Sequence, residues 1–154
     1  MVPLKTLLRW SFAAILGFTS LTHAAEIGQI KISKGTVTLE RDGQSRPGST
    51  GMRIHGSDVV KTGADGSVGI TMSDNSLLSL GPNSVLSLDR YEFDSTTHRG
   101  AFDASLRSGS MAVVSGSIAK QSPDAMTVRT PFAVLGVRGT EFVVSANEPP
   151  SATR

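Results

Sequence analysis

Residues 130–142, Thr130-Pro131-Phe132-Ala133-Val134-Leu135-Gly136-Val137-Arg138-Gly139-Thr140-Glu141-Phe142, indicate the fold class of this chain most clearly. We call this segment the closing block. Its proline, its two glycines and its β-branched residues all disfavour a helix. The block therefore predicts two short strands, with the glycines bending the chain or letting a neighbouring strand approach closely.

The rest of the chain has the same strand-like pattern. Apolar residues recur at every second position in Ile30/Ile32, Val37/Leu39, Val68/Ile70/Met72, Leu78/Leu80, Leu86/Leu88, Phe102/Ala104/Leu106 and Met126/Val128. A period of two places one face of a strand on a core and the other in water. Because no window shows a helical period, we expect an all-β protein: a single compact β-sandwich or roll of short antiparallel strands.

Turn signals separate these segments. Asp42-Gly43 is a favoured two-residue hairpin turn, because both residue types tolerate a positive φ. The segment Val59–Leu88 predicts three strands arranged as a meander or as successive rungs of a short roll. Met111–Val114 predicts a further strand, and the polar segment Arg90–Arg99 a protruding hairpin or loop. A short β-solenoid is the alternative fold, although the turn spacing drifts more than a solenoid repeat would.

The N-terminus has the layout of a secretory signal peptide. Lys5 and Arg9 precede the apolar run Trp10–Leu21, and small residues then flank His23, which predicts cleavage after Ala24 or one residue later. As a helix, this run would cover about 18 Å of a hydrocarbon core about 30 Å thick, which argues against a membrane anchor. We therefore expect a signal peptide at 1–24, a β domain at 25–146 and a flexible tail at 147–154.

The composition excludes several kinds of functional site and indicates where the protein is located. The chain has no cysteine, which excludes disulfides, zinc–thiolate sites, thiol nucleophiles and a lipid-anchored cysteine. Of the 15 Lys and Arg residues, Lys5 and Arg9 lie in the leader, so the exported chain would carry 13 basic and 13 acidic residues. Such a chain, with few aromatics, is not expected to bind nucleic acid. We expect a periplasmic or secreted protein without a transmembrane segment after export.

The closing block also supplies the candidate binding residues. Arg138 has two interpretations: it satisfies backbone carbonyls or pairs with Glu141 or an aspartate across a strand, or it contacts a partner peptide or an acidic ligand. The best candidates for binding are Arg138, Thr140 and Glu141. The residues assigned to the structural signature of the block are Thr130, Pro131, Gly136 and Gly139.

The sequence gives little support for catalysis or metal binding. His55 and Asp58 are two ligands where a tight metal site needs three or four. No nucleophile elbow and no phosphate-binding loop occurs. A pair of carboxylates for glycoside hydrolysis stays open, because it needs only two acids close in space. We expect no enzyme, no metal and no cofactor.

Three stretches together resemble the FecR domain, the β-rich periplasmic module of bacterial iron-uptake signalling proteins. Residues 56–63 are similar to its entry into a strand, and residues 67–84 to its strand–turn–strand centre. Val128–Phe142 resembles its closing motif T-P-x-A-x-x-x-V-R-G-T-x-F, which is the most specific of the three. The resemblance covers roughly Gly35 to Val144.

The resemblance implies an all-β domain outside the cytoplasmic membrane. Signalling members of the family relay the state of an outer-membrane receptor to a membrane-anchored anti-sigma segment, and no such segment is recognisable here. Family domains often continue with another strand pair, where this chain has Glu148-Pro149-Pro150. Three alternatives follow. A partner protein or a second copy of the chain completes the fold, or this branch of the family lacks the strand pair.

The function expected from these observations is non-enzymatic. The chain would bind a protein or a cell-envelope ligand in the periplasm or cell envelope, with an exposed strand edge accepting a partner strand. A self-assembling structural protein is the first alternative, and modulation of a separate membrane-bound transducer, in envelope or iron-related signalling, is the second. A hydrolase acting on an envelope polymer is less favoured.

Overall fold

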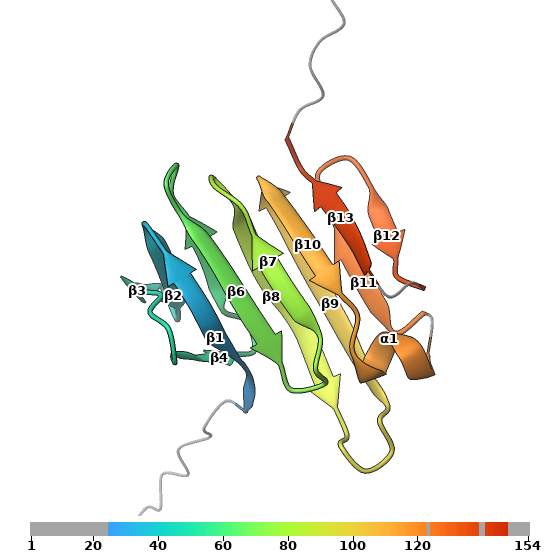
Figure 1. Ribbon diagram of the computed structural model, residues 1–154. Helices are drawn as coiled ribbons and strands as arrows, with labels where there is room; N and C mark the ends of the chain where they lie inside the picture. The colour runs from blue at the N-terminus through green and yellow to red at the C-terminus, as the bar shows by residue number, and fades with distance from the viewer. Residues whose placement is uncertain (1–24, 123, 139–140, 148–154) are drawn as a thin grey trace, which may run out of the picture.

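The computed structural model describes residues 25–122, 124–138 and 141–147. Within them, thirteen strands form two stacked sheets, and one short helix, α1 (Ser117–Gln121), lies beside one end of the stack (Figure 1). This confirms the all-β prediction. The proposed signal peptide, residues 1–24, and most of the proposed tail, residues 148–154, lie outside the described part of the chain.

The two sheets differ in length by one strand. The six-stranded sheet has, in spatial order, β13 (Glu141–Ser145), β10 (Ser110–Val114), β7 (Leu77–Leu80), β6 (Ser67–Met72), β1 (Glu26–Lys34) and β4 (Arg53–His55). The seven-stranded sheet has β12 (Val134–Gly136), β11 (Met126–Arg129), β9 (Gly100–Ser108), β8 (Val85–Phe93), β5 (Val59–Thr62), β2 (Val37–Arg41) and β3 (Gln44–Pro47). Pairing is antiparallel except between β9 and β11. This arrangement is a sandwich, so the solenoid alternative does not hold.

The alternating residues form the core between the sheets, as the period of two predicts. In β6, for example, Val68, Ile70 and Met72 are each 2 % exposed, whereas the residues between them face outward. The buried set includes Leu39, Leu86 and Leu106 of the other sheet. Two packed apolar faces of this kind supply the main stabilising free energy of a β-sandwich.

Several local predictions are confirmed. Asp42 and Gly43 have φ angles of 51° and 74° and join β2 to β3 in the predicted hairpin. The segment Arg90–Arg99 forms the protruding end of the β8–β9 hairpin, which extends below the sandwich in Figure 1. Met111–Val114 lies in β10.

Two predictions were incomplete or wrong. The segment Val59–Leu88 contains four strands and is not a meander, because β6 and β7 belong to one sheet while β5 and β8 pair in the other. A period of two tells which residues face the core but not which sheet a strand joins. Helix α1 was not predicted, because five residues are too few to show a helical period.

The chain crosses between the sheets at points held by buried polar side chains. The turn between β7 and β8 carries Ser84, which is fully buried; its hydroxyl donates to the carbonyl of Gly81 at 2.8 Å and accepts from the amide of Ser110 at 3.0 Å. Gly109, with φ 83°, lies at the next crossing, between β9 and β10. It packs so closely against Ser84 that a Cβ would not fit. Backbone groups that leave the strand ladders at these crossings are thereby satisfied by side chains.

Candidate interaction surface

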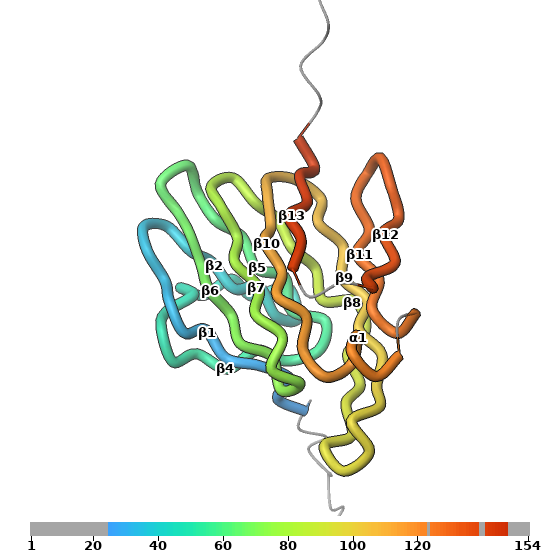
Figure 2. The backbone as a smooth tube through the Cα atoms, turned by 45° about the vertical axis from the view of Figure 1, so that its right-hand side comes forward, coloured from blue at the N-terminus to red at the C-terminus, as the bar shows by residue number. Residues whose placement is uncertain are grey.

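The closing block forms one end of the sandwich. Residues 130–136 make the β11–β12 hairpin at the edge of the seven-stranded sheet, and Glu141 begins β13 at the edge of the six-stranded sheet. Figure 2 shows the two edge strands side by side but apart, with the β12 hairpin beyond β13. Among the described residues, no further strand pairs with the outer edge of β12 or of β13.

An apolar groove lies at this end of the sandwich. It encloses about 260 Å³ and is lined by Leu135, Gly136, Val137, Arg138, Phe142 and Val143. Leu135 and Phe142 are partly buried against the core, whereas Val137 is buried, with its amide bonded to the carbonyl of Met126 at 2.9 Å. Among the described residues of the lining, Arg138 is the charged one.

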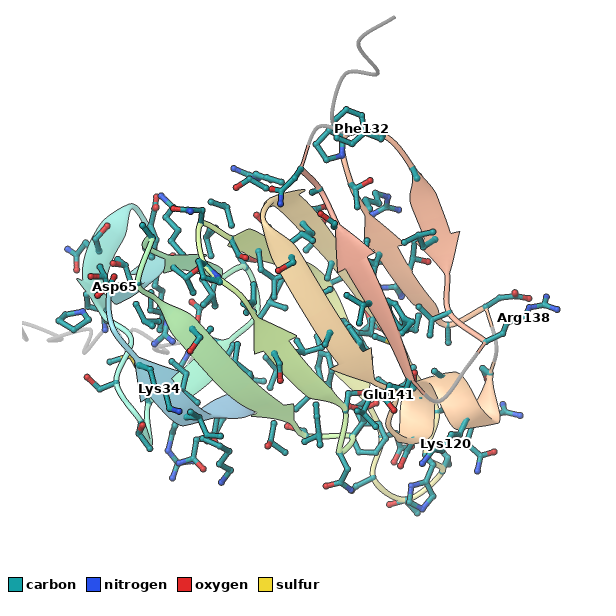
Figure 3. All side chains as sticks on the ribbon, turned by 45° about the horizontal axis from the view of Figure 1, so that its top comes forward. Lys34, Asp65, Lys120, Phe132, Arg138 and Glu141 are labelled. Carbon is teal, nitrogen blue, oxygen red and sulfur yellow. The ribbon has the colours of Figure 1, made fainter. Side chains whose placement is uncertain are left out.

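Exposed apolar side chains gather at the same end. Phe132, Val134 and Val143 are 62 %, 67 % and 74 % exposed, the highest values among the large apolar residues that the structure describes. Figure 3 shows Phe132 at the tip of the β11–β12 hairpin. Val134 alternates with the partly buried Leu135, and Val143 with the buried Val144, so these two side chains lie on the outer faces of the two sheets at this end.

The structure describes two of the three candidate binding residues, Arg138 and Glu141. Arg138 points away from the sandwich (Figure 3), and its side chain is 73 % exposed. It donates to a carboxylate oxygen of Asp124 at 3.0 Å, an aspartate just before β11 that the sequence did not single out. Glu141 is exposed at the start of β13, while Thr140 lies outside the described residues.

The signature residues have different roles. The hydroxyl of Thr130 accepts from the amides of Phe132 and Ala133 at 3.3 and 3.0 Å and so fixes the hairpin turn that contains Pro131. Gly136 has no positive φ, and a Cβ placed there would meet nothing within 4 Å, so the geometry does not explain this glycine. Gly139 lies outside the described residues.

Two buried aspartates stabilise other parts of the sandwich, and the sequence did not predict the role of either. Asp58 is fully buried and accepts from Arg41 Nε and Nη2, each at 2.7 Å. Its carboxylate also accepts from the amide of His55 at 2.8 Å. The pair His55–Asp58, considered above as metal ligands, thus belongs to a structural network at the crossing from β4 to β5.

Asp74 has a similar role in the hairpin turn between β6 and β7 of the six-stranded sheet. It is fully buried and accepts from the Tyr91 hydroxyl at 3.1 Å and from the amide of Ile118 in α1 at 3.2 Å. Burial, and then the Asp74 charge, raise the pKa of Tyr91 above its ordinary value, which keeps its hydroxyl neutral as a donor. The Ser73-Asp74-Asn75-Ser76 turn was the available signal, since aspartate in such a turn bonds the amide two residues on.

In the part of the chain that the structure describes, no three potential metal ligands of the His, Cys, Asp or Glu type lie close enough to hold an ion. No helix among those residues has the length and the apolar character needed to cross a membrane.

Comparison with known proteins agrees with the resemblance seen in the closing block. The family model described as FecR protein matches residues 58–153, beginning at the buried Asp58 and including the β12–β13 end. No curated protein and no solved structure matches the chain. Because the family match covers more than half of the 154 residues, the chain belongs to the FecR protein family.

Proposed function

We propose that this chain is an exported, non-enzymatic interaction module of the bacterial cell envelope, and that it binds another protein through its β12–β13 end. The observation that carries the proposal is the apolar groove between two open sheet edges, with Val134 and Val143 exposed beside it. Exposed sheet edges bind extended segments of other proteins through main-chain hydrogen bonds. The chain belongs to a family that includes signalling proteins. This supports a role in signalling, in which binding of the other protein conveys the state of the cell envelope.

The charge distribution supports the choice of this end. The outer face of the seven-stranded sheet carries charged residues on neighbouring strands, among them Glu40 and Lys61, which form an ion pair. At the β12–β13 end the groove is apolar, with Arg138 as the charged residue of its lining. Uncharged, aromatic-containing patches with a charged rim are typical of protein interfaces.

Site-specific photo-crosslinking in cells tests the proposal. A photo-reactive residue at Val134 should give an adduct with a second envelope protein, because this side chain is 67 % exposed beside the groove. The same residue at Ser45, on the opposite sheet edge β3, is the matched control and should give none. Equal adducts at both positions, or none at Val134, would contradict the proposed surface. An adduct of twice the chain's mass would support self-assembly instead.

Arg138→Ala separates binding from architecture at this surface. Exposed ion pairs contribute about 1 kcal/mol or less, so losing the Arg138–Asp124 contact should hardly change the stability of the domain. We expect the Arg138 variant to keep the wild-type melting curve and to give less of the Val134 adduct. If the adduct forms at the wild-type level, Arg138 has no part in binding. Its role is then structural only.

A further inference from the structure

One strand position in the sandwich is vacant among the described residues. The seven-stranded sheet ends in β12, whereas the facing six-stranded sheet ends in β13. Figures 1 and 2 both show β12 beyond β13, so that no described strand covers the inner face of β12 next to β13. Leu135 of β12 and Phe142 of β13, both partly buried, line the groove described above together with the buried Val137. The lining of this groove is mainly apolar.

Alternate residues of β13 direct their backbone N–H and C=O groups to its open edge, where another strand could pair. The amide of Ala146 donates to the carbonyl of Gly109 at 2.9 Å, which places Ala146, Val144 and Phe142 in the hydrogen-bonded set facing β10. In an antiparallel ladder the bonding direction alternates along the strand, so the N–H and C=O of Val143 and of its second neighbours point to the open edge. The other side of β10 has the opposite phase, with the Gly81 amide bonded to the Ser110 carbonyl at 3.0 Å.

The other three edges have features that discourage strand addition. β4 and β12 are three residues long, and β1, which pairs with β4, has an irregular register there. β3 carries Arg46 and Pro47. β13 has five residues in unbroken register with β10, no proline, and no charge after Glu141. Short strands, charged residues, prolines and bulges prevent unwanted strand pairing at the free sheet edges of natural proteins. β13 has none of these features along most of its length.

We propose that an extended segment of a partner protein adds to β13 as the seventh strand of the six-stranded sheet. This inference rests on the proposed function and names the chemistry of the partner. The segment carries apolar residues at alternate positions, which face the partly buried Leu135 and Phe142, and uncharged residues between them.

The geometry argues against the other occupants. Suppose that a second copy paired its β13 antiparallel with β13 of the first, across a two-fold axis. The six-stranded sheets of the two copies would then join, and their seven-stranded sheets would approach each other at the same axis. The seven-stranded sheet of the copy would then meet β12, which already extends beyond β13 (Figure 1). The segment after Asn147 begins Glu148-Pro149-Pro150, and prolines lack the amide that strand pairing needs.

Selection from a phage-displayed library of random dodecapeptides on the full chain, expressed with its own leader, tests the proposal. Enriched peptides should be apolar at alternate positions. Their Kd should rise roughly tenfold or more in Val143→Pro, because proline removes one edge-facing N–H and blocks the register. Val143→Thr keeps the amide and the β-branched shape and is the matched control, with wild-type affinity expected.

Val143→Pro should fold, because the Val143 amide faces the open edge and makes no bond to β10. Should it fail to fold, Leu135→Glu, which places a charge in the groove from the facing strand, should weaken binding by the same order. Unchanged affinity in both variants, or no enriched peptides, would overturn the proposal. It would also be overturned by a dimer that Val143→Pro dissociates, or by tighter peptide binding after removal of residues 148–154.

The two proposals fail in different ways. If the Val134 adduct with an envelope protein survives in Val143→Pro, the proposed function holds and strand addition at β13 does not. If no adduct forms at Val134 in the wild-type chain, the proposed function fails whatever the peptides do.

Discussion

Replacing Arg41 by alanine should lower the free energy of unfolding by about 3 kcal/mol, the cost of leaving a buried charge without its partner. Asp58 is fully buried, and both of its carboxylate oxygens accept from the Arg41 guanidinium at 2.7 Å. Arg41 Nη2 also donates to the carbonyl of Arg53 at 3.0 Å, so the pair connects β2 to β4 across the sandwich. Urea unfolding followed by far-ultraviolet circular dichroism measures the loss.

Arg46 provides the control for this prediction. It lies on the neighbouring strand β3, is exposed, and its replacement by alanine should change stability by about 0.5 kcal/mol or less. Arg41→Lys should lie between the two, because an ammonium group cannot donate to both carboxylate oxygens in the fork geometry of a guanidinium. Equal stability of Arg41→Ala and the wild type would mean that the pair does not stabilise the crossing.

Asp74→Ala should destabilise the domain by about 3 kcal/mol, since several buried donors lose their common acceptor. The carboxylate accepts from the Ser76 amide at 3.1 Å, the Ser76 hydroxyl at 2.8 Å, the Tyr91 hydroxyl at 3.1 Å and the Ile118 amide at 3.2 Å. The β6–β7 turn, β8 and α1 are connected through this one group. The free energy of unfolding in urea measures the effect, and α1 should lose amide protection first.

Asp94 is the matched control for Asp74. It makes the same kind of turn contacts, accepting from the Thr96 amide at 2.8 Å and the Thr97 hydroxyl at 2.9 Å, but in the exposed tip of the β8–β9 hairpin. Asp94→Ala should cost about 1 kcal/mol or less, because water replaces the lost acceptor. If both aspartate variants lost the same stability, burial of Asp74 would not be the cause.

The sequence predicts the local part of this fold well. Alternation predicts which face of β6 or β9 packs in the core, and Asp42-Gly43 predicts the β2–β3 hairpin, because both signals depend on neighbouring residues alone. Strand partners are not predictable in this way, since β5 and β8 pair only after the chain has passed through the other sheet. The parallel contact of β9 with β11 likewise depends on tertiary packing.

The candidate surface was predictable in location but not in detail. The glycines, the proline and Arg138 singled out the closing block, and the block does lie at two sheet edges. The partner of Arg138 could not be foreseen, because Asp124 lies in a turn before β11 and approaches only in the folded chain. Asp58 and Asp74 resemble ordinary turn residues in the sequence, because the local pattern does not show that their side chains are buried.

Amide hydrogen exchange along β13, resolved residue by residue by NMR in the free protein, tests the open edge most directly. We expect the amides of Phe142 and Val144, which face β10, to be protected, and the amide of Val143 between them to exchange rapidly. Protection of Val143 equal to that of its neighbours would show the edge already covered. Rapid exchange at all three would show that β13 does not pair with β10, and either result would contradict a sandwich open at this end.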